Sequence, residues 1–239
     1  MQLSKLEDNA YRTLRKSNLS VFTVKDLSLL LGINRTKAYN LIKALKNKEA
    51  IITIKSGKYS FSDINEFVIG AYLNWPSYVS FISALNYYHY SDNIPKKILY
   101  ATTKNSEELD GFKYVHVSKK KFFGYEGINE IIIANKEKAF IDSLMFPKYS
   151  LGINHVQDCL KSAIGEIDLN KLTSYALQLD IKSVIRRLGY LLEEIDTGNK
   201  HLKYMERLNK RIGKGIELLD PSLERKNNLN KKWLLDINN

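Results

Sequence analysis

Apolar residues recur at helical spacing between Thr23 and Gly32. Thr23 is a favourable N-cap residue, and Asp26 stands three positions later, where the acid of a capping box belongs. The apolar positions that follow are Leu27, Leu30 and Leu31. The pattern predicts a short helix that begins after Thr23 and ends at Gly32.

A second amphipathic segment begins at Asn34, which we expect to cap a helix. Its apolar stripe consists of Ala38, Leu41, Ile42 and Leu45. The opposite face has no acid and carries Thr36, Asn40, Lys43 and Asn47, with Lys37 and Tyr39 on its flanks. Two short helices joined at a glycine, the second with such a face, are typical of a helix-turn-helix that reads the major groove. Many soluble proteins contain an amphipathic helix pair, so the periodicity alone leaves both interpretations open.

A hairpin pattern follows the second helix. The segment AIITIKSGKYSF, residues 50–61, alternates apolar and polar residues and turns at Ser56-Gly57. A hairpin at this place is typical of a winged helix, whose tip would bring Lys55, Lys58 and Tyr59 to backbone phosphates. The first helix of the three-helix core would be supplied upstream by Leu6, Ala10, Tyr11 and Leu14.

Helical and strand patterns alternate along the rest of the chain. We expect helices at residues 64–73, 78–90, 136–146, 156–164, 169–179, 181–195 and 200–212, with caps such as Asp168 and Asn199. We expect strands at residues 98–102, 112–117, 130–134, 216–219 and 233–237, with loops at residues 104–111 and 119–125. The predicted fold class is α+β, with an N-terminal winged helix-turn-helix domain at residues 1–74 and a larger mixed α/β domain at residues 75–239.

The charge of the chain is concentrated near its start. The formal net charge is +11, and residues 1–62 hold 12 Lys or Arg against 4 Asp or Glu, a net +8. The remaining residues hold 25 against 22, a net +3. A basic excess in the segment with the winged-helix pattern is the electrostatic footprint expected for binding a polyanion.

The sequence offers little support for an enzyme or a membrane protein. No segment is long and apolar enough to cross a membrane, and the single Cys159 allows no internal disulfide, so we expect a cytoplasmic protein. Four scattered histidines form no metal-binding motif, and the glycines form no phosphate-binding loop. The acid-x-Lys triplets at residues 180–182 and 224–226 lie in polar turns. We therefore expect no catalysis, no metal and no cofactor.

Several segments together resemble the AbiEi family of antitoxins, which belongs to type IV toxin-antitoxin and abortive-infection systems. The segments are SFISALNYYHYSDNIPKKILYATTK at residues 80–104, YVHVSKKKFFGYE at 114–126, KEKAFID at 136–142, SVIRRLGYLLE at 183–193 and NKKWLLDIN at 230–238. Their order and spacing behind an N-terminal winged helix cover most of the chain. No single segment is a catalytic signature.

The resemblance implies a protein with two roles. Members of the family look like transcriptional repressors that bind repeats in their own promoter through the winged helix, commonly with more than one copy on the operator. They also look like antitoxins that counter a nucleotidyltransferase-like toxin through the C-terminal domain without a stable complex. Transferred to this chain, the DNA-binding role falls on Arg35, Thr36, Lys37, Tyr39, Asn40, Lys43, Lys55 and Lys58.

The residues that would carry antitoxicity are less well defined by the resemblance. The candidates are Lys119, Lys120, Lys121, Arg186 and Arg187. The three lysines could equally form a solvated loop, and the two arginines could pair with Glu193, Glu194 or Asp196. The neighbouring Phe122, Phe123 and Tyr125 could stack on bases or be buried, as could Tyr87, Tyr88 and Tyr90.

Two other functions fit the same sequence. A stand-alone winged-helix regulator would have no toxin partner, and a protein-interaction module would use its winged helix to bind another protein. Salt dependence distinguishes DNA binding from protein binding by the winged helix. DNA binding through the charge of residues 1–62 would weaken steeply with salt. A protein-binding winged helix would instead expose an apolar patch on its second helix, and the sequence shows none there.

Overall fold

The computed structural model describes residues 2–196, 198 and 200–239 of the chain. The chain divides into two compact units, one that ends at Pro76 and one that begins at Ser77. This division falls two residues beyond the junction placed from the sequence. Among the described residues, no helix is both long enough and apolar enough to cross a bilayer.

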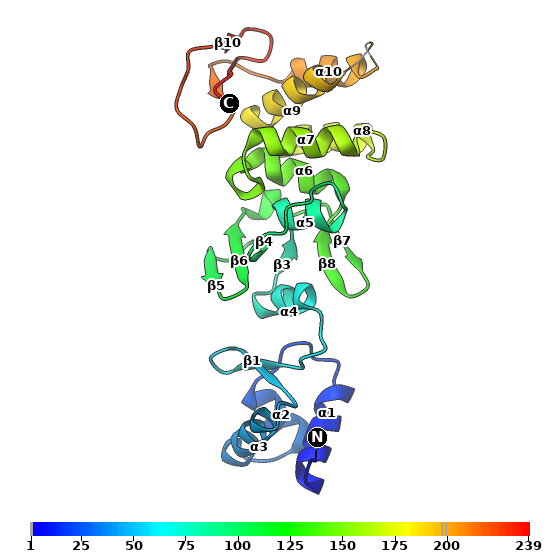
Figure 1. The fold of residues 1–239 in the computed structure, drawn as a ribbon, viewed down its shortest axis with the longest axis vertical. Helices are drawn as coiled ribbons and strands as arrows, with labels where there is room; N and C mark the ends of the chain where they lie inside the picture. Colours follow the sequence, from blue (N-terminus) through cyan, green and yellow to red (C-terminus); the bar gives the residue numbers. More distant parts are fainter. Residues whose placement is uncertain (1, 197, 199) are drawn as a thin grey trace. The chain divides into compact units, whose positions relative to one another are not determined.

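The N-terminal unit consists of three helices, a two-stranded hairpin and a fourth helix (Figure 1). The elements are α1 (Lys5–Lys16), α2 (Val24–Leu31), α3 (Arg35–Asn47), β1 (Ile52–Lys55), β2 (Lys58–Ser60) and α4 (Glu66–Leu73). The predicted cap of α2 is present as a complete capping box between Thr23 and Asp26. Gly32 ends α2 in the left-handed conformation with φ 63°, which glycine adopts without strain.

One apolar core joins α1, α2, α3 and the hairpin of this unit. Its buried residues come from α1, α2, α3, the segment between α1 and α2, and the segments that flank the hairpin: Ala10, Leu14, Phe22, Leu27, Ala38, Ile42, Leu45, Ala50, Ile51 and Phe61. The hairpin pairs antiparallel and turns at Gly57, with Lys55 opposite Lys58. Its middle is anchored because Phe22 and Tyr59 exchange two backbone hydrogen bonds of 2.9 Å. The arrangement is the three-helix core with a short wing that the sequence predicts.

The C-terminal unit is built on a six-stranded mixed sheet in the order β5-β6-β4-β3-β8-β7. The strands are β3 (Ser77–Val79), β4 (Ile98–Thr102), β5 (Glu107–Leu109), β6 (Phe112–His116), β7 (Tyr125–Ile128) and β8 (Ile131–Ala134). The central strand β3 runs antiparallel to β4 and parallel to β8. The outer strands β5 and β7 each form a hairpin with the strand beside them.

Helices complete this unit in successive layers (Figure 1). They are α5 (Phe81–Tyr87), α6 (Lys136–Met145), α7 (Ile153–Ala163), α8 (Leu169–Leu179), α9 (Lys182–Ile195) and α10 (Leu202–Asn209), with 3-10 turns η1 (Lys119–Lys121) and η2 (Pro147–Ser150). A small sheet of β9 (Glu217–Leu218), β10 (Leu229–Asn230) and β11 (Leu235–Asp236) lies near the C-terminus. Asp168 caps α8 as predicted, whereas the expected cap Asn199 lies outside the described residues.

Several predicted boundaries in the larger unit were wrong. Residues 77–79 form the central strand β3, where we expected the first turn of a helix that runs to residue 90. Strand β5 lies in a segment expected to be a loop, β7 begins at the last residue of the other expected loop, and β10 has no counterpart among the expected strands. The helix expected at residues 200–212 spans Leu202–Asn209. In the N-terminal unit, the helix expected at residues 64–73 begins at Glu66 behind an Asn65 cap.

Candidate nucleic-acid interface

The outer face of α3 is polar, basic and exposed. Six predicted DNA-binding residues lie on it with exposed side chains: Arg35, Thr36, Lys37, Tyr39, Asn40 and Lys43. The opposite face of the helix is buried in the core through Ala38, Ile42 and Leu45. The division between the faces is therefore the one that the apolar stripe predicts, and the six side chains lie together on one surface.

Local hydrogen bonds fix the direction in which α3 leaves the turn. The Asn34 side chain accepts a hydrogen bond of 2.9 Å from the backbone N–H of Lys37 and thereby caps the helix. The Ser28 hydroxyl donates to the Ile33 carbonyl at 2.6 Å, which ties α2 to the start of α3. Because α2 ends at Gly32 in the left-handed conformation, the two helices are separated by a tight turn. The exposed face of α3 is thus held on a rigid support.

The wing differs from the prediction at two of its three tip residues. Lys55 is exposed, as expected. Lys58 is half-buried, and its Nζ donates to the backbone carbonyl of Leu73 at 2.6 Å. Tyr59 lies in the middle of the paired segment, where its ring stacks on Phe22 with centroids 6.4 Å apart. A period-two pattern cannot reveal these contacts, because both partners lie outside the hairpin.

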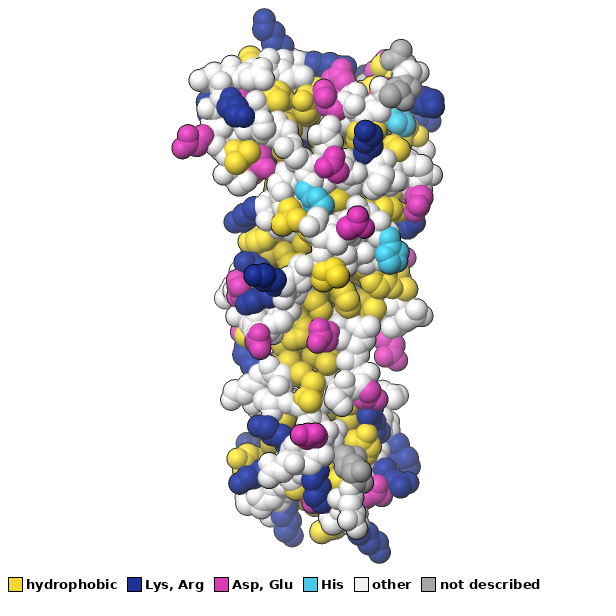
Figure 2. Space-filling model, viewed as in Figure 1, with side chains coloured by type: hydrophobic (Ala, Val, Ile, Leu, Met, Phe, Trp, Pro, Cys, Tyr) yellow, Lys and Arg dark blue, Asp and Glu magenta, His cyan; other side chains and the backbone are white. Residues whose placement is uncertain are grey.

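Several acids of the N-terminal unit form ion pairs with basic residues other than those on the outer face of α3. Glu7 pairs with Lys48 at 2.6 Å, and Arg15 pairs with Asp63 at 2.8 Å. The hydrogen bond from Arg15 holds the pKa of Asp63 below its usual value. Among the described residues, Arg35, Lys37 and Lys43 form no ion pair. Figure 2 shows Lys and Arg side chains spread over this unit, in the lower part of the view.

The lysines proposed as antitoxin candidates form the short turn η1. Lys119 and Lys120 are exposed and Lys121 is half-buried. The aromatic residues beside them pack inward: Phe122 lies 4.9 Å from Tyr78, and Phe123 lies 5.1 Å from Tyr175, between ring centroids. The three lysines therefore remain at the surface, while the two phenylalanines serve packing.

The other aromatic candidates also have partners inside the C-terminal unit. Tyr125 keeps 42% of its surface exposed but stacks on Tyr78. Tyr88 donates a hydrogen bond of 3.0 Å to the Ala134 carbonyl, and burial raises the pKa of its hydroxyl well above the usual value. Tyr90 is buried, and its hydroxyl donates to Glu166 at 3.1 Å. Packing accounts for these rings.

Arg186 and Arg187, the two other antitoxin candidates, are buried. Their exposed fractions are 1% and 4%. Arg186 donates to the carbonyls of Ile212 and Lys214 at 2.9 and 2.8 Å. Arg187 donates to the carbonyls of Leu144, Leu218 and Leu219 at 2.8 to 3.0 Å. The expected partners Glu193, Glu194 and Asp196 take no part in these bonds, and both guanidinium groups tie α9 to the following chain.

Sequence reasoning missed a buried charged cluster in α6. Lys138 and Asp142 are fully buried and form an ion pair one helical turn apart. The Asp142 carboxylate also accepts hydrogen bonds from the Tyr78 hydroxyl at 3.0 Å and the Ser80 hydroxyl at 2.7 Å. The signal was a lysine and an acid four residues apart inside the otherwise apolar run of α6. The cluster joins α6 to β3.

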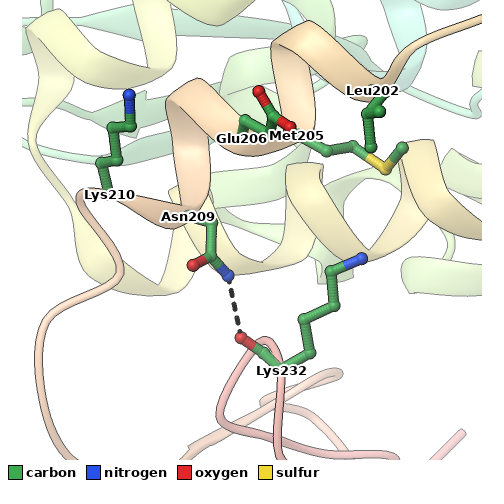
Figure 3. Close-up of a pocket in the computed structure, with 6 residues that line it drawn as sticks. All are labelled: Leu202, Met205, Glu206, Asn209, Lys210 and Lys232. Atoms are coloured by element: carbon green, nitrogen blue, oxygen red, sulfur yellow. Dashed lines mark hydrogen bonds between the residues drawn. The ribbon is translucent and has the colours of Figure 1, made fainter.

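Metal-ligating side chains are scattered in the part of the chain that the structure describes. No group of three His, Cys, Asp or Glu side chains lies close enough to hold a metal ion there. An open groove of about 350 Å³ lies along α10 and is lined by Leu202, Met205, Glu206, Asn209, Lys210 and Lys232 (Figure 3). Asn209 spans it with a hydrogen bond of 3.1 Å to the Lys232 carbonyl.

Comparison with known proteins shows that the overall fold resembles that of a solved structure. No protein-family model matches the sequence, and no curated protein matches it significantly. Among solved structures, the chain is similar to the crystal structure of the RV2827C protein from Mycobacterium tuberculosis, with a TM-score of 0.67 and 12% sequence identity. The match covers 98% of this chain and 92% of that one. At this identity the likeness concerns the fold alone, and it confirms the predicted α+β fold class.

Proposed function

We propose that this chain is a cytoplasmic DNA-binding repressor that reads double-stranded DNA through α3. The observation that carries the proposal is the outer face of α3, which is exposed, free of acids and rich in donors, on a helix anchored by a three-helix core. A helix of this kind fits the major groove and presents the residues of its N-terminal half to base edges.

The side chains on this face suit different parts of a duplex. Arg35 can donate two hydrogen bonds to a guanine, and the Asn40 amide can both donate to and accept from an adenine. Lys37 and Lys43 suit backbone phosphates, which fix register without reading sequence. The apolar edge of Tyr39, which is 53% exposed, can contact a thymine methyl group.

A nuclease-protection experiment on the DNA upstream of its own gene tests the proposal. We expect the full chain to protect repeats in that DNA, with more than one copy bound. Lys43→Glu should abolish protection, because it places a negative charge against the phosphates. Lys16→Glu on α1 is the matched control, since Lys16 is also exposed in the same unit but lies outside α3. Absence of protection at low salt would reject the proposal.

We also propose that the C-terminal unit counters a nucleotidyltransferase-like toxin without a stable complex. The resemblance of five ordered segments to the AbiEi family supports this role, and the exposed Lys119 and Lys120 remain its candidate residues. Co-expression with a nucleotidyltransferase-like protein encoded beside this gene should restore growth. If DNA binding holds but growth is not restored, the chain is a stand-alone regulator.

The remaining alternative is a winged helix that binds another protein. The observation in its favour is on α2, where Leu29 and Leu30 have exposed fractions of 70% and 43%. The same leucines could serve self-association on DNA. Leu29→Ser tests whether these leucines serve protein binding or self-association instead of the DNA contact. If they do, the variant should bind a single isolated repeat with unchanged affinity. Loss of single-repeat binding in this variant would favour a role for α2 in the DNA contact itself.

A further inference from the structure

Lys58 makes a contact that its place on the wing does not predict. It is the first residue of β2 and stands opposite the exposed Lys55, yet its own side chain is half-buried. Its Nζ donates a hydrogen bond of 2.6 Å to the carbonyl of Leu73, the last residue of α4. The wing is therefore joined at this residue to a helix that follows it in sequence.

The end of α4 is a place where a cation is useful. The last carbonyls of any helix lack partners within the helix, and the negative end of its dipole favours a positive charge. The last turn of α4 contains no basic residue, and its C-cap Asn74 has φ −130° instead of the left-handed conformation that commonly closes a helix. Lys58 supplies the charge and the donor from outside the helix.

The wing is anchored independently at its base. The Ser60 hydroxyl donates to the Ser20 carbonyl at 2.7 Å, and Phe22 pairs with Tyr59 through two backbone hydrogen bonds. The base and the middle of the hairpin are thus fixed to the core, whereas Lys58 holds the end nearest the turn. Removing its ammonium should loosen that half without unfolding the unit.

We infer that Lys58 is a positioning residue, which holds the wing against the C-terminal end of α4, while the wing's phosphate contact is made by Lys55. The inference rests on the proposed DNA-binding function and deepens it. It also makes α4 part of the DNA-binding unit, because the acceptor of Lys58 lies beyond the hairpin, at Leu73.

The salt dependence of DNA binding distinguishes the two lysines, because each phosphate contact contributes about one to the slope of log K against log salt. The experiment uses the full chain and a duplex from its own upstream DNA. Lys58→Met should weaken DNA binding several-fold and leave the salt slope unchanged. Lys58→Arg, which keeps a cationic donor, should bind DNA nearly as tightly as the unmodified chain. Lys55→Ala is the matched control, in which the slope should fall by about one.

Hydrogen exchange without DNA provides the second measurement. Lys58→Met should speed amide exchange in the last turn of α4, whereas Lys55→Ala should leave it unchanged. The inference is overturned if Lys58→Met lowers the salt slope as Lys55→Ala does, or if exchange in α4 does not change. If the unmodified chain binds no DNA, the proposed function fails, and the exchange result still decides whether Lys58 holds α4.

Discussion

Asn40 is the residue on α3 whose chemistry is most informative about sequence reading. Its exposed amide can pair with a base edge, whereas the lysines beside it suit phosphates of any sequence. We expect Asn40→Ala to weaken binding to the operator by about 1–3 kcal/mol and binding to random DNA far less. The Kd for each duplex, measured at one salt concentration, checks this.

Asn47 provides the control for that substitution. It lies on the same exposed face, but at the C-terminal end of α3, which should stand farther from the groove. Asn47→Ala should therefore cost less than Asn40→Ala. Equal losses on operator and random DNA for Asn40→Ala would remove its base-reading role.

Gly189 is required by a close approach in the C-terminal unit. A Cβ at this position would lie 2.1 Å from the ring of Trp233, which is fully buried and donates from its Nε1 to Glu193 at 2.5 Å. Gly189→Ala should reduce the free energy of unfolding by about 2 kcal/mol or more, since the ring must move. Gly165→Ala, where a Cβ meets no atom within 4 Å, is the control in urea unfolding. Similar midpoints for the two variants would contradict this account.

At the scale of single residues, sequence reasoning succeeded where the cause is local. Thr23, Gly32 and Asn34 act within a few residues of their own positions, so their roles as caps could be predicted. Arg186 and Arg187 could not be placed, because the carbonyls that bind them come mostly from residues 212–219. Burial of an arginine depends on such distant partners, which periodicity does not reveal.

Helix α6 is the element whose packing is most constrained. Nine of its ten residues are buried, and the buried Lys138 and Asp142 compensate each other. Asp142→Ala should cost about 3–5 kcal/mol of stability, because it leaves the Lys138 ammonium buried without a partner. Adding Lys138→Met should recover part of this loss. Urea unfolding of both single variants and the double variant measures the coupling, and strictly additive losses would refute it.

Helix α7 owes its start to a carboxylate from a distant segment. Asp220 accepts hydrogen bonds from the backbone N–H of Ile153 at 2.8 Å and of Ser222 at 2.9 Å. Burial raises the pKa of this carboxyl. The hydrogen bond from the Ser222 hydroxyl, the two backbone hydrogen bonds and the charge of Arg187 together lower the pKa by more, so the net pKa lies below the ordinary 3.8. Its stabilisation is therefore present above the unfolded-state pKa and is lost as the pH falls through the folded-state value.

Asp220→Asn tests this contribution of Asp220. The variant should be less stable than the unmodified chain near neutral pH. The difference should shrink as the pH falls from about 4 through the lower folded-state pKa, because Asp220 is protonated first in the unfolded state and then in the folded state. Thermal unfolding across this range provides the measurement. A difference that stays constant with pH would show that the charge of Asp220 is irrelevant.

Among the elements, long periodic segments were predictable and short strands were not. Helices α6, α8 and α9 lie within a residue or two of their expected ranges, because each combines a regular apolar face with several turns. Strand β3 has three residues, all buried, and the sequence pattern assigned them to the helix that follows. Strand β5 lies at the edge of the sheet with polar side chains, so alternation gave no signal there.

For the whole molecule, the division into a small basic unit and a larger unit agrees with the charge distribution. The first 62 residues hold a net +8 of the total +11, and α3 with its exposed basic face lies among them. The fold likeness at 12% identity shows that this architecture persists across very different sequences. This likeness does not address the chemistry of α3. The proposed function therefore rests on the exposed side chains of α3.

Binding of the full chain to its own upstream duplex and to a scrambled duplex, titrated across salt, tests the central claim most directly. We predict tighter binding to the upstream duplex and a linear fall of log K with log salt, by about one unit of slope per phosphate contact. Lys43→Glu should weaken binding to both duplexes strongly, because Lys43 faces the phosphates, which both duplexes share. No binding to either duplex at low salt, or an affinity that does not change with salt, would contradict the account.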